Sequence, residues 1–205
     1  MPKYQRRLGD IVKGCVTIDD FLITPFRLNH PQNAIGYRID DTTTGASIAY
    51  ACDHEHGNRR IDNKIKKAIR GCDVVIGDSS FAHRVLNVEE LRPHLPEHVK
   101  AKTKFAVYDD HRGCGHSTLE EWVKFGISAN VREIIGTHHE PRHKDVALDL
   151  TLEDVRRKYP GVNVDLAIEY SILEVEKGSV KYLYVPSIEI ILEELASIHI
   201  VKKLR

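Results

Sequence analysis

The chain has 205 residues, of which 41% are hydrophobic and 29% are charged. This composition argues against a disordered chain and suits one globular domain, or one domain with an appendage, that buries its own core. Thirty basic residues balance thirty acidic ones, so no overall field attracts nucleic acid or a membrane. Any recognition of phosphate therefore has to be local.

The opening residues MPKYQRRLGD lack the apolar core of a secretory signal, and no apolar run approaches the roughly 18 residues that span a bilayer. We expect a cytoplasmic protein without membrane contact. The four cysteines are scattered and form no CxxC pair, which favours reduced and mostly buried thiols. Twelve histidines are many for this length, and several lie beside Asp, Glu or another His, so metal binding is the first function to consider.

Strands are predicted in the first quarter of the chain at 16–28, 34–39 and 46–51, separated by the turn-forming segments HPQN and DDTTTG. A short helix is predicted over 61–71, followed by an apolar strand at 73–81 that runs into a polar loop. The stretch 88–104 is charged and contains proline, which is typical of a surface insertion.

The alternation of strand and helix continues in the second half. A helix from Thr118 to Ser128 is predicted because Ser117 and Thr118 precede Glu120 and Glu121 at capping-box spacing. A strand at 131–137, a helix around 152–159 and a strand around 164–170 follow. Strands that alternate with helices in this way favour an α/β layered fold.

The end of the chain differs from the rest. We expect residues 1–175 to form the main domain and 176–205 to add a strand and an amphipathic terminal helix. The helix is predicted from Ser187 onward by apolar residues at helical spacing, namely Ile188, Ile191, Leu192, Leu195 and Ile198. Such a helix either packs on its own domain or forms a subunit interface.

The segment THHEPRHKD at 137–145 contains HEPRH, which fits the HExxH pattern of zinc helices. In a zinc helix the two histidines lie one turn apart on a continuous helix, but here Pro141 occupies the third position of the motif. An interior proline costs about 3 kcal/mol and removes a backbone hydrogen bond. We therefore predict that the match is fortuitous, although a loop after a buried strand is where α/β proteins place ligands.

Five segments form a recognisable series: RLNHPQNAIGYRI, IAYACDHEH, DVVIGDSSF, GHSTLEEW and IIGTHHEPRHKD. In this order they resemble the second half of metallo-β-lactamase-fold hydrolases, most closely the ribonuclease Z-like and phosphodiesterase members, over residues from about 20 to about 170. The resemblance implies the C-terminal half of an αββα sandwich. It also implies a metal-dependent hydrolase, with zinc, manganese or iron, that attacks a phosphodiester or similar ester with metal-activated water.

The resemblance also implies which residues form the site. His30, shortly before the GYRI strand, matches a ligand histidine, and Asp53 in AYACD matches a carboxylate that bridges two metals. His139 matches the ligand histidine after a strand, with His138 as the alternative ligand or as a partner that orients it. His116 in GHST matches a histidine that donates a proton, or stabilises charge, near the scissile phosphate.

Four further residues near these motifs are not expected to bind metal directly. Asp78 in GDSSF is expected to be structural or to orient a ligand. His54 and His56 follow Asp53 and are expected to be loop residues near the site. Asp145 is a candidate for holding the loop that carries His139.

The family motif HxHxDH, which supplies several ligands from the first half of the fold, has no match in this chain. A complete two-metal centre is therefore not expected from one copy. The chain is either half of a split hydrolase, a shortened and self-associating relative with a different metal site, or a non-catalytic binding module. We expect a homodimer or a complementing chain, because a single sheet of the sandwich leaves apolar surface uncovered. The expected substrate class is a nucleotide or nucleic-acid phosphodiester. The identity of the substrate stays open.

Overall fold

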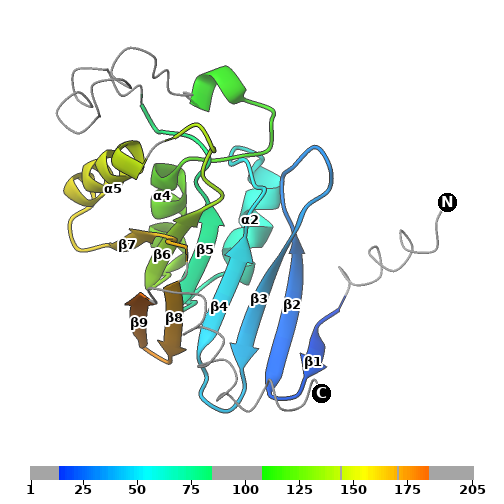
Figure 1. Cartoon of the computed structure of the whole chain (residues 1–205). Helices are drawn as coiled ribbons and strands as arrows, with labels where there is room; N and C mark the ends of the chain where they lie inside the picture. Colours follow the sequence, from blue (N-terminus) through cyan, green and yellow to red (C-terminus); the bar gives the residue numbers. More distant parts are fainter. Residues whose placement is uncertain (1–13, 85–107, 144, 170, 185–205) are drawn as a thin grey trace.

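The structure is a computed structural model that describes residues 14–84, 108–143, 145–169 and 171–184. The predicted insertion at 88–104 and the predicted helix from Ser187 lie outside these residues. The described part of the chain forms a seven-stranded mixed sheet, three α-helices and a two-stranded hairpin (Figure 1). None of its helices is long and apolar enough to cross a membrane.

The strands of the large sheet lie side by side in chain order, antiparallel from β1 to β4 and parallel from β4 to β7. The predicted strand at 16–28 divides into two at a turn, where Asp19 has a φ of 50°. The strands are β1 (Val16–Ile18), β2 (Phe21–Arg27), β3 (Ile35–Asp41), β4 (Ser47–Ala51), β5 (Val74–Asp78), β6 (Glu133–Thr137) and β7 (Asn163–Leu166).

Within the described residues, three helices connect the parallel strands: α2 (Arg59–Ala68), α4 (Leu119–Ala129) and α5 (Asp145–Lys158). Crossovers between parallel strands are almost always right-handed, so successive crossovers in one direction place their helices on one face of the sheet. The core lies between that face and the helices. It includes one residue at the same level of each parallel strand, namely Ala49, Val75, Ile134 and Val164.

Helix α4 begins as the sequence predicts. The hydroxyl of Thr118 accepts the Glu121 N–H at 3.3 Å, and the Glu121 carboxylate accepts the Thr118 N–H at 3.0 Å. The helix packs closely on the sheet: a Cβ atom on Gly77 of β5 would lie 2.5 Å from Cδ2 of the buried Trp122. The capping box therefore fixes the start of a tightly packed helix, with His116 two residues before the cap.

The segment that contains HEPRH is not helical. Helix α5 begins only at Asp145, beyond both histidines of the motif, and runs to Lys158. The prediction that HEPRH is a fortuitous match to a zinc helix is confirmed. The helix predicted around 152–159 is thus the second half of a longer one.

The face of the sheet opposite the helices carries the hairpin β8 (Ser171–Glu176) and β9 (Ser179–Tyr184), which lies beside β4. The strand that the sequence predicted within 176–205 corresponds to β9, whereas β8 was not predicted, and the predicted division after residue 175 falls inside β8. The hairpin turn is fastened to the sheet by buried Asp73. One Asp73 oxygen accepts the Gly178 N–H at 2.9 Å, and the other accepts the Ser47 N–H at 3.0 Å.

The same face exposes large apolar side chains at its other end. The strand register places three of them together on β1 and β2, with exposed fractions between 36% and 54%: Val16, Ile18 and Phe21. Exposed apolar patches of this kind often mark surfaces where a protein contacts a partner. A second copy or a complementing chain over this face stays a prediction.

Glu120 links α4 to the end of α5. Its buried carboxylate accepts hydrogen bonds from Lys158 Nζ at 2.7 Å and from the Tyr159 hydroxyl at 2.9 Å, and Lys124 Nζ lies 2.7 Å away. Burial by itself would raise the pKa of Glu120, but these three donors outweigh it and lower the pKa to about 2. The charged form is therefore favoured in the folded state.

We expect Glu120→Gln to lower the free energy of unfolding at pH 7 by about 1–3 kcal/mol, because a charged hydrogen-bond acceptor is lost. Since the folded-state pKa is depressed, the stabilisation by Glu120 is present above its unfolded pKa of about 4.3 and is lost as the pH falls toward about 2. The variant should thus match the wild type more closely at pH 3 than at pH 7. Urea unfolding at both pH values measures this, with Glu174→Gln on the exposed hairpin as the control. An equal loss at both pH values would contradict the charge argument.

Candidate metal centre

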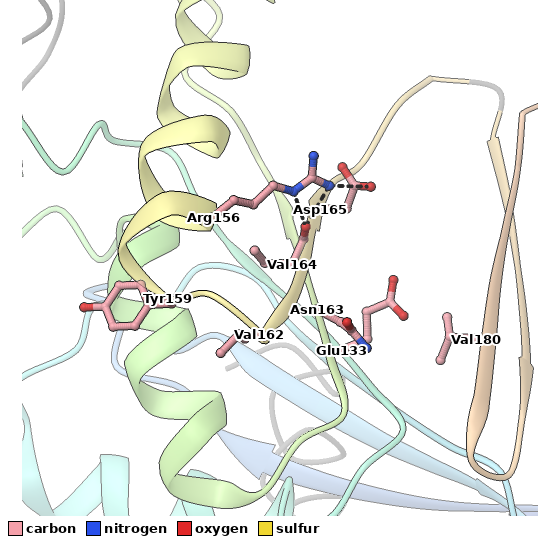
Figure 2. A pocket seen from close by; sticks show the side chains of 9 residues that line it. Glu133, Arg156, Tyr159, Val162, Asn163, Val164, Asp165 and Val180 are labelled. Atoms are coloured by element: carbon pink, nitrogen blue, oxygen red, sulfur yellow. Dashed lines mark hydrogen bonds and ion pairs between the residues drawn. The ribbon is translucent and has the colours of Figure 1, made fainter.

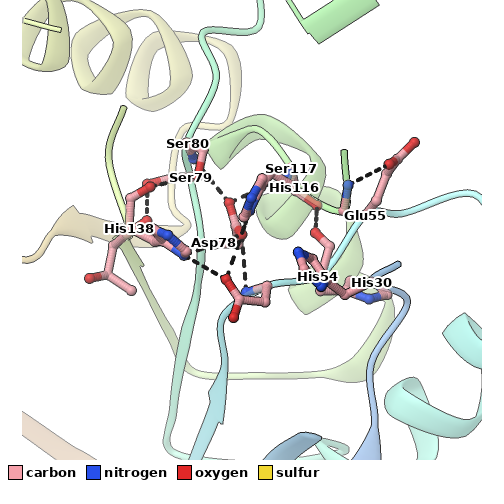
Figure 3. Close-up of polar contacts among 12 residues, drawn as sticks. His30, His54, Glu55, Asp78, Ser79, Ser80, His116, Ser117 and His138 are labelled. Atoms are coloured by element: carbon pink, nitrogen blue, oxygen red, sulfur yellow. Dashed lines mark hydrogen bonds and ion pairs between the residues drawn. The ribbon is translucent and has the colours of Figure 1, made fainter. Parts of the chain in front are cut away.

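Polar side chains gather where three parallel strands end. Asp53 follows β4, Asp78 is the last residue of β5, and His138 follows β6, while His116 comes from the loop before α4 (Figure 3). The carboxyl ends of adjacent parallel strands meet at one edge of the sheet, where α/β proteins bind ligands. One donor atom from each of these four residues lies within 4.8 Å of the others. Asp53, Asp78, His116 and His138 are called the four-residue cluster below.

Asp53 and His138 form the outer pair of the cluster. Asp53 Oδ1 lies 3.0 Å from His138 Nδ1, and their side chains are 42% and 45% exposed. Both residues have left-handed backbone, with φ values of 61° and 60°. Such values are uncommon for residues other than glycine, cost backbone energy, and cluster at functional sites. A strained turn therefore follows both β4 and β6, and the two turns carry the exposed side chains of Asp53 and His138.

Asp78 and His116 form the inner pair. Asp78 is fully buried, and its Oδ2 lies 2.7 Å from His116 Nδ1 and accepts the Asp53 N–H at 3.1 Å. Its Oδ1 accepts the Ser80 N–H at 3.0 Å. The hydrogen bond to Asp78 raises the pKa of His116 above its usual value. The sequence suggested a structural or orienting role for Asp78, and its carboxylate indeed contacts both the Asp53 backbone and the His116 ring.

The residues present fit a divalent metal. Carboxylates and imidazoles are ligands of zinc, manganese and iron. With metal–ligand bonds of about 2.1 Å, neighbouring ligand atoms of a tetrahedral or octahedral site lie about 3.0–3.4 Å apart. His138 Nδ1 lies 3.0 Å from Asp53 Oδ1 and 3.7 Å from Asp78 Oδ2, close to that range. Small side-chain movements would therefore bring these donors to one ion.

His30 lies at the edge of the cluster. Its ring is next to that of His116, with centroids 5.4 Å apart, but its donor atoms are not among those of the four-residue cluster. His30 Nδ1 accepts the Gln32 N–H at 3.2 Å. The structure thus brings His30 to the site as a neighbour of His116, and its predicted role as a ligand is untested.

His139 points away from Asp53. Its Nδ1 lies 3.1 Å from Ser79 Oγ, which itself donates to the Thr137 carbonyl at 3.0 Å. Burial lowers the pKa of His139, which favours the neutral form of the ring. Of the two adjacent histidines, His138 is the one that the structure brings together with Asp53. The motif alone left that choice open.

A second cluster, made of His54, His56 and Asp62, follows Asp53 in the chain. His54 Nε2 lies 3.2 Å from His56 Nδ1 and 3.3 Å from Asp62 Oδ1. The backbone N–H of Asn29 donates to His54 Nδ1 at 3.1 Å, so the proton of a neutral His54 ring is on Nε2 and points at those two groups.

A metal would have to bind His54 at Nε2, which already carries the proton. The second cluster therefore acts as a hydrogen-bonded support for the loop that follows Asp53. Burial and the neighbouring His54 lower the pKa of His56 to about 3, which keeps its ring neutral. Both histidines lie in the loop after β4 and next to Asp53, as the sequence predicted. His54 is in addition fully buried, packed at 5.6 Å against Trp122.

A pocket of about 420 Å³ adjoins the outer pair and is lined by Ala34, Ile35, Tyr50, Cys52, Asp53, Thr137 and His138. Its volume is in the range of small-molecule sites. A pocket of about 500 Å³ lies beside β7 (Figure 2), away from the cluster. There, Arg156 already pairs with Asp165 at 3.1 Å and donates to the Val164 carbonyl. Of these two pockets, the first is therefore the one that adjoins the four-residue cluster.

No family model matches the chain, and no curated protein matches it by sequence. Similar folds occur among solved structures. The metallo-β-lactamase fold protein YhfI from Bacillus subtilis matches with a TM-score of 0.53 and 17% identity, over 83% of this chain and 53% of YhfI. The predicted fold is confirmed. This chain has the α/β architecture of metallo-β-lactamase fold proteins.

Two further structures match less closely. The short form of human tRNase Z has a TM-score of 0.44 and 16% identity, over 83% of this chain and 46% of that protein. A diphosphatase from the PhnP family has a TM-score of 0.43 and 17% identity, over 84% of this chain and 48% of that protein. The chain spans about half the length of all three structures.

Proposed function

We propose that this chain is a metal-dependent hydrolase that cleaves a phosphodiester or a similar ester. The observation that supports this most strongly is the four-residue cluster, in which two carboxylates and two imidazoles converge at the carboxyl ends of the parallel strands. The metallo-β-lactamase fold supports the same proposal by analogy.

Each residue of the cluster has a role in this proposal. Asp53 and His138 would hold a divalent metal, with Asp78 beside them, and the metal would polarise the ester and activate water. His116 would donate a proton to the leaving oxygen. Its Nδ1 faces Asp78 at 2.7 Å, which leaves Nε2 as the ring atom that delivers the proton. Asp78 raises the pKa of His116, so the protonated ring persists to higher pH.

The first test is the metal-to-chain ratio of protein purified without added metal, measured by elemental mass spectrometry. We expect about one or more zinc, manganese or iron per chain. Hydrolysis of bis(p-nitrophenyl) phosphate should disappear on chelation and return when the metal is restored. A chain that binds no metal even after incubation with zinc would contradict the proposal for the chain alone.

We also propose that a second copy or a complementing chain covers the exposed apolar face of the sheet. The lack of an HxHxDH match supports this, because further ligands would then come from the partner. Light scattering on the same sample gives the molecular mass. A metal-bearing, active monomer would contradict the need for a partner.

A further inference from the structure

Glu55 fastens the loop that carries His116. Its two carboxylate oxygens accept the Gly113 N–H at 3.0 and 2.9 Å, and one of them also accepts the Gly115 N–H at 2.9 Å. Figure 3 shows the Glu55 side chain reaching toward this loop. Two backbone donors of one short loop therefore converge on one carboxylate. Hydrogen bonds to a charged acceptor of this kind are about twice as strong as neutral ones.

The conformation of the loop depends on its glycines. Gly113 and Gly115 have φ values of 85° and 96°, in the left-handed region that favours glycine. A Cβ atom on Gly115 would lie only 2.0 Å from His30 Cδ2, so the loop backbone is pressed against that ring. Backbone N–H groups in such turns form concave sites for anions. Here the anion is the Glu55 carboxylate, and His116 follows Gly115 directly.

Glu55 is itself held on a third segment. Its N–H donates to the Asn29 carbonyl at 3.0 Å, and its carbonyl accepts the Asn29 side-chain amide at 2.7 Å. Glu55 also lies two residues after Asp53. Glu55 thus connects the segments that carry His30, Asp53 and His116. Its backbone is held in place by the two hydrogen bonds with Asn29.

We infer that Glu55 is a positioning residue that holds the loop from Gly113 to His116 so that the His116 ring meets Asp78. The inference rests on the proposed function only in giving His116 a part in hydrolysis. If Glu55 only stabilised the loop, removing its carboxylate would loosen the loop and leave the position of the His116 ring unchanged. The two possibilities differ in what happens to that ring when the carboxylate is removed.

Glu55→Ala tests the inference, with Glu55→Gln as the conservative variant and Glu174→Ala on the hairpin as the control. Amide hydrogen exchange of Gly113 and Gly115, followed by NMR, should accelerate by about tenfold or more in Glu55→Ala, because both acceptors are lost. The nuclear Overhauser contact between the His116 and His30 rings, whose centroids lie 5.4 Å apart, should weaken. Glu55→Gln keeps one oxygen acceptor and should lie between.

Activity provides an independent measurement. For hydrolysis of thymidylyl-thymidine, kcat of Glu55→Ala should fall about tenfold, because a displaced ring loses only part of the roughly 10²–10⁴-fold that a proton donor contributes, while KM and metal content stay unchanged. Unchanged exchange and unchanged ring contacts would overturn the inference. A displaced ring with unaltered kcat would confirm the positioning and contradict the part of His116 in hydrolysis. If the wild type has no hydrolytic activity but the exchange and ring contacts change as expected, the proposed function fails and the positioning of His116 stands.

Discussion

Replacing His138 with asparagine is expected to weaken metal binding by about 100-fold or more, whereas the same replacement of His139 should leave it within a few-fold. Changes to residues that merely orient a ligand cost about 10–100-fold in metal affinity, so loss of a direct ligand should reach or exceed that limit. His138 Nδ1 lies 3.0 Å from Asp53 Oδ1, but His139 Nδ1 faces Ser79. The two histidines are neighbours in the chain, so each variant is the matched control of the other.

Asparagine is the appropriate replacement because His138 has a φ of 60°, and asparagine tolerates left-handed backbone better than alanine does. Asp53→Asn follows the same logic at a φ of 61° and should abolish both metal retention and turnover. Metal per chain after dialysis against a chelator and hydrolysis of bis(p-nitrophenyl) phosphate measure the two effects. Loss of metal in His139→Asn with retention in His138→Asn would return the ligand role to His139, as the motif resemblance indicates.

The fold was predictable because its signals are local. The capping box at Thr118 and Glu121 sets the start of α4, and Pro141 excludes a zinc helix. Each is a short-range effect of one or two side chains on the nearby backbone. The order of the motifs then indicated the metallo-β-lactamase fold, and it placed Asp53 and His116 where the structure brings them together.

The remaining features of the site depend on tertiary contacts. His138 and His139 are adjacent and chemically identical. The side chain of His138 lies toward Asp53, and its backbone has a left-handed φ that nothing in the sequence of a histidine indicates. Asp78 accepts hydrogen bonds from three backbone N–H groups, two of which come from distant segments. The Glu55 carboxylate and its glycine partner Gly113 lie 58 positions apart. None of these contacts has a periodicity or spacing that could be recognised in the chain.

His116→Gln is expected to retain the metal and to lower kcat by an amount that depends on the leaving group. The glutamine amide can still donate a hydrogen bond to Asp78, so the buried carboxylate keeps a side-chain donor beside its three backbone donors. It cannot transfer a proton, however. General acid catalysis contributes about 10²–10⁴-fold, and the benefit grows as the leaving oxygen becomes more basic.

The comparison of two substrates therefore separates a proton donor from a metal ligand. With thymidylyl-thymidine, which has an alkoxide leaving group, kcat of His116→Gln should fall by about 10²–10⁴-fold. With bis(p-nitrophenyl) phosphate, whose leaving group departs without protonation, it should fall only a few-fold. The control is His111→Gln, because His111 stacks on Phe81 at 4.8 Å, outside the four-residue cluster. Loss of metal in His116→Gln, or an equal loss of rate with both substrates, would instead make His116 a ligand, because a missing ligand impairs every substrate alike.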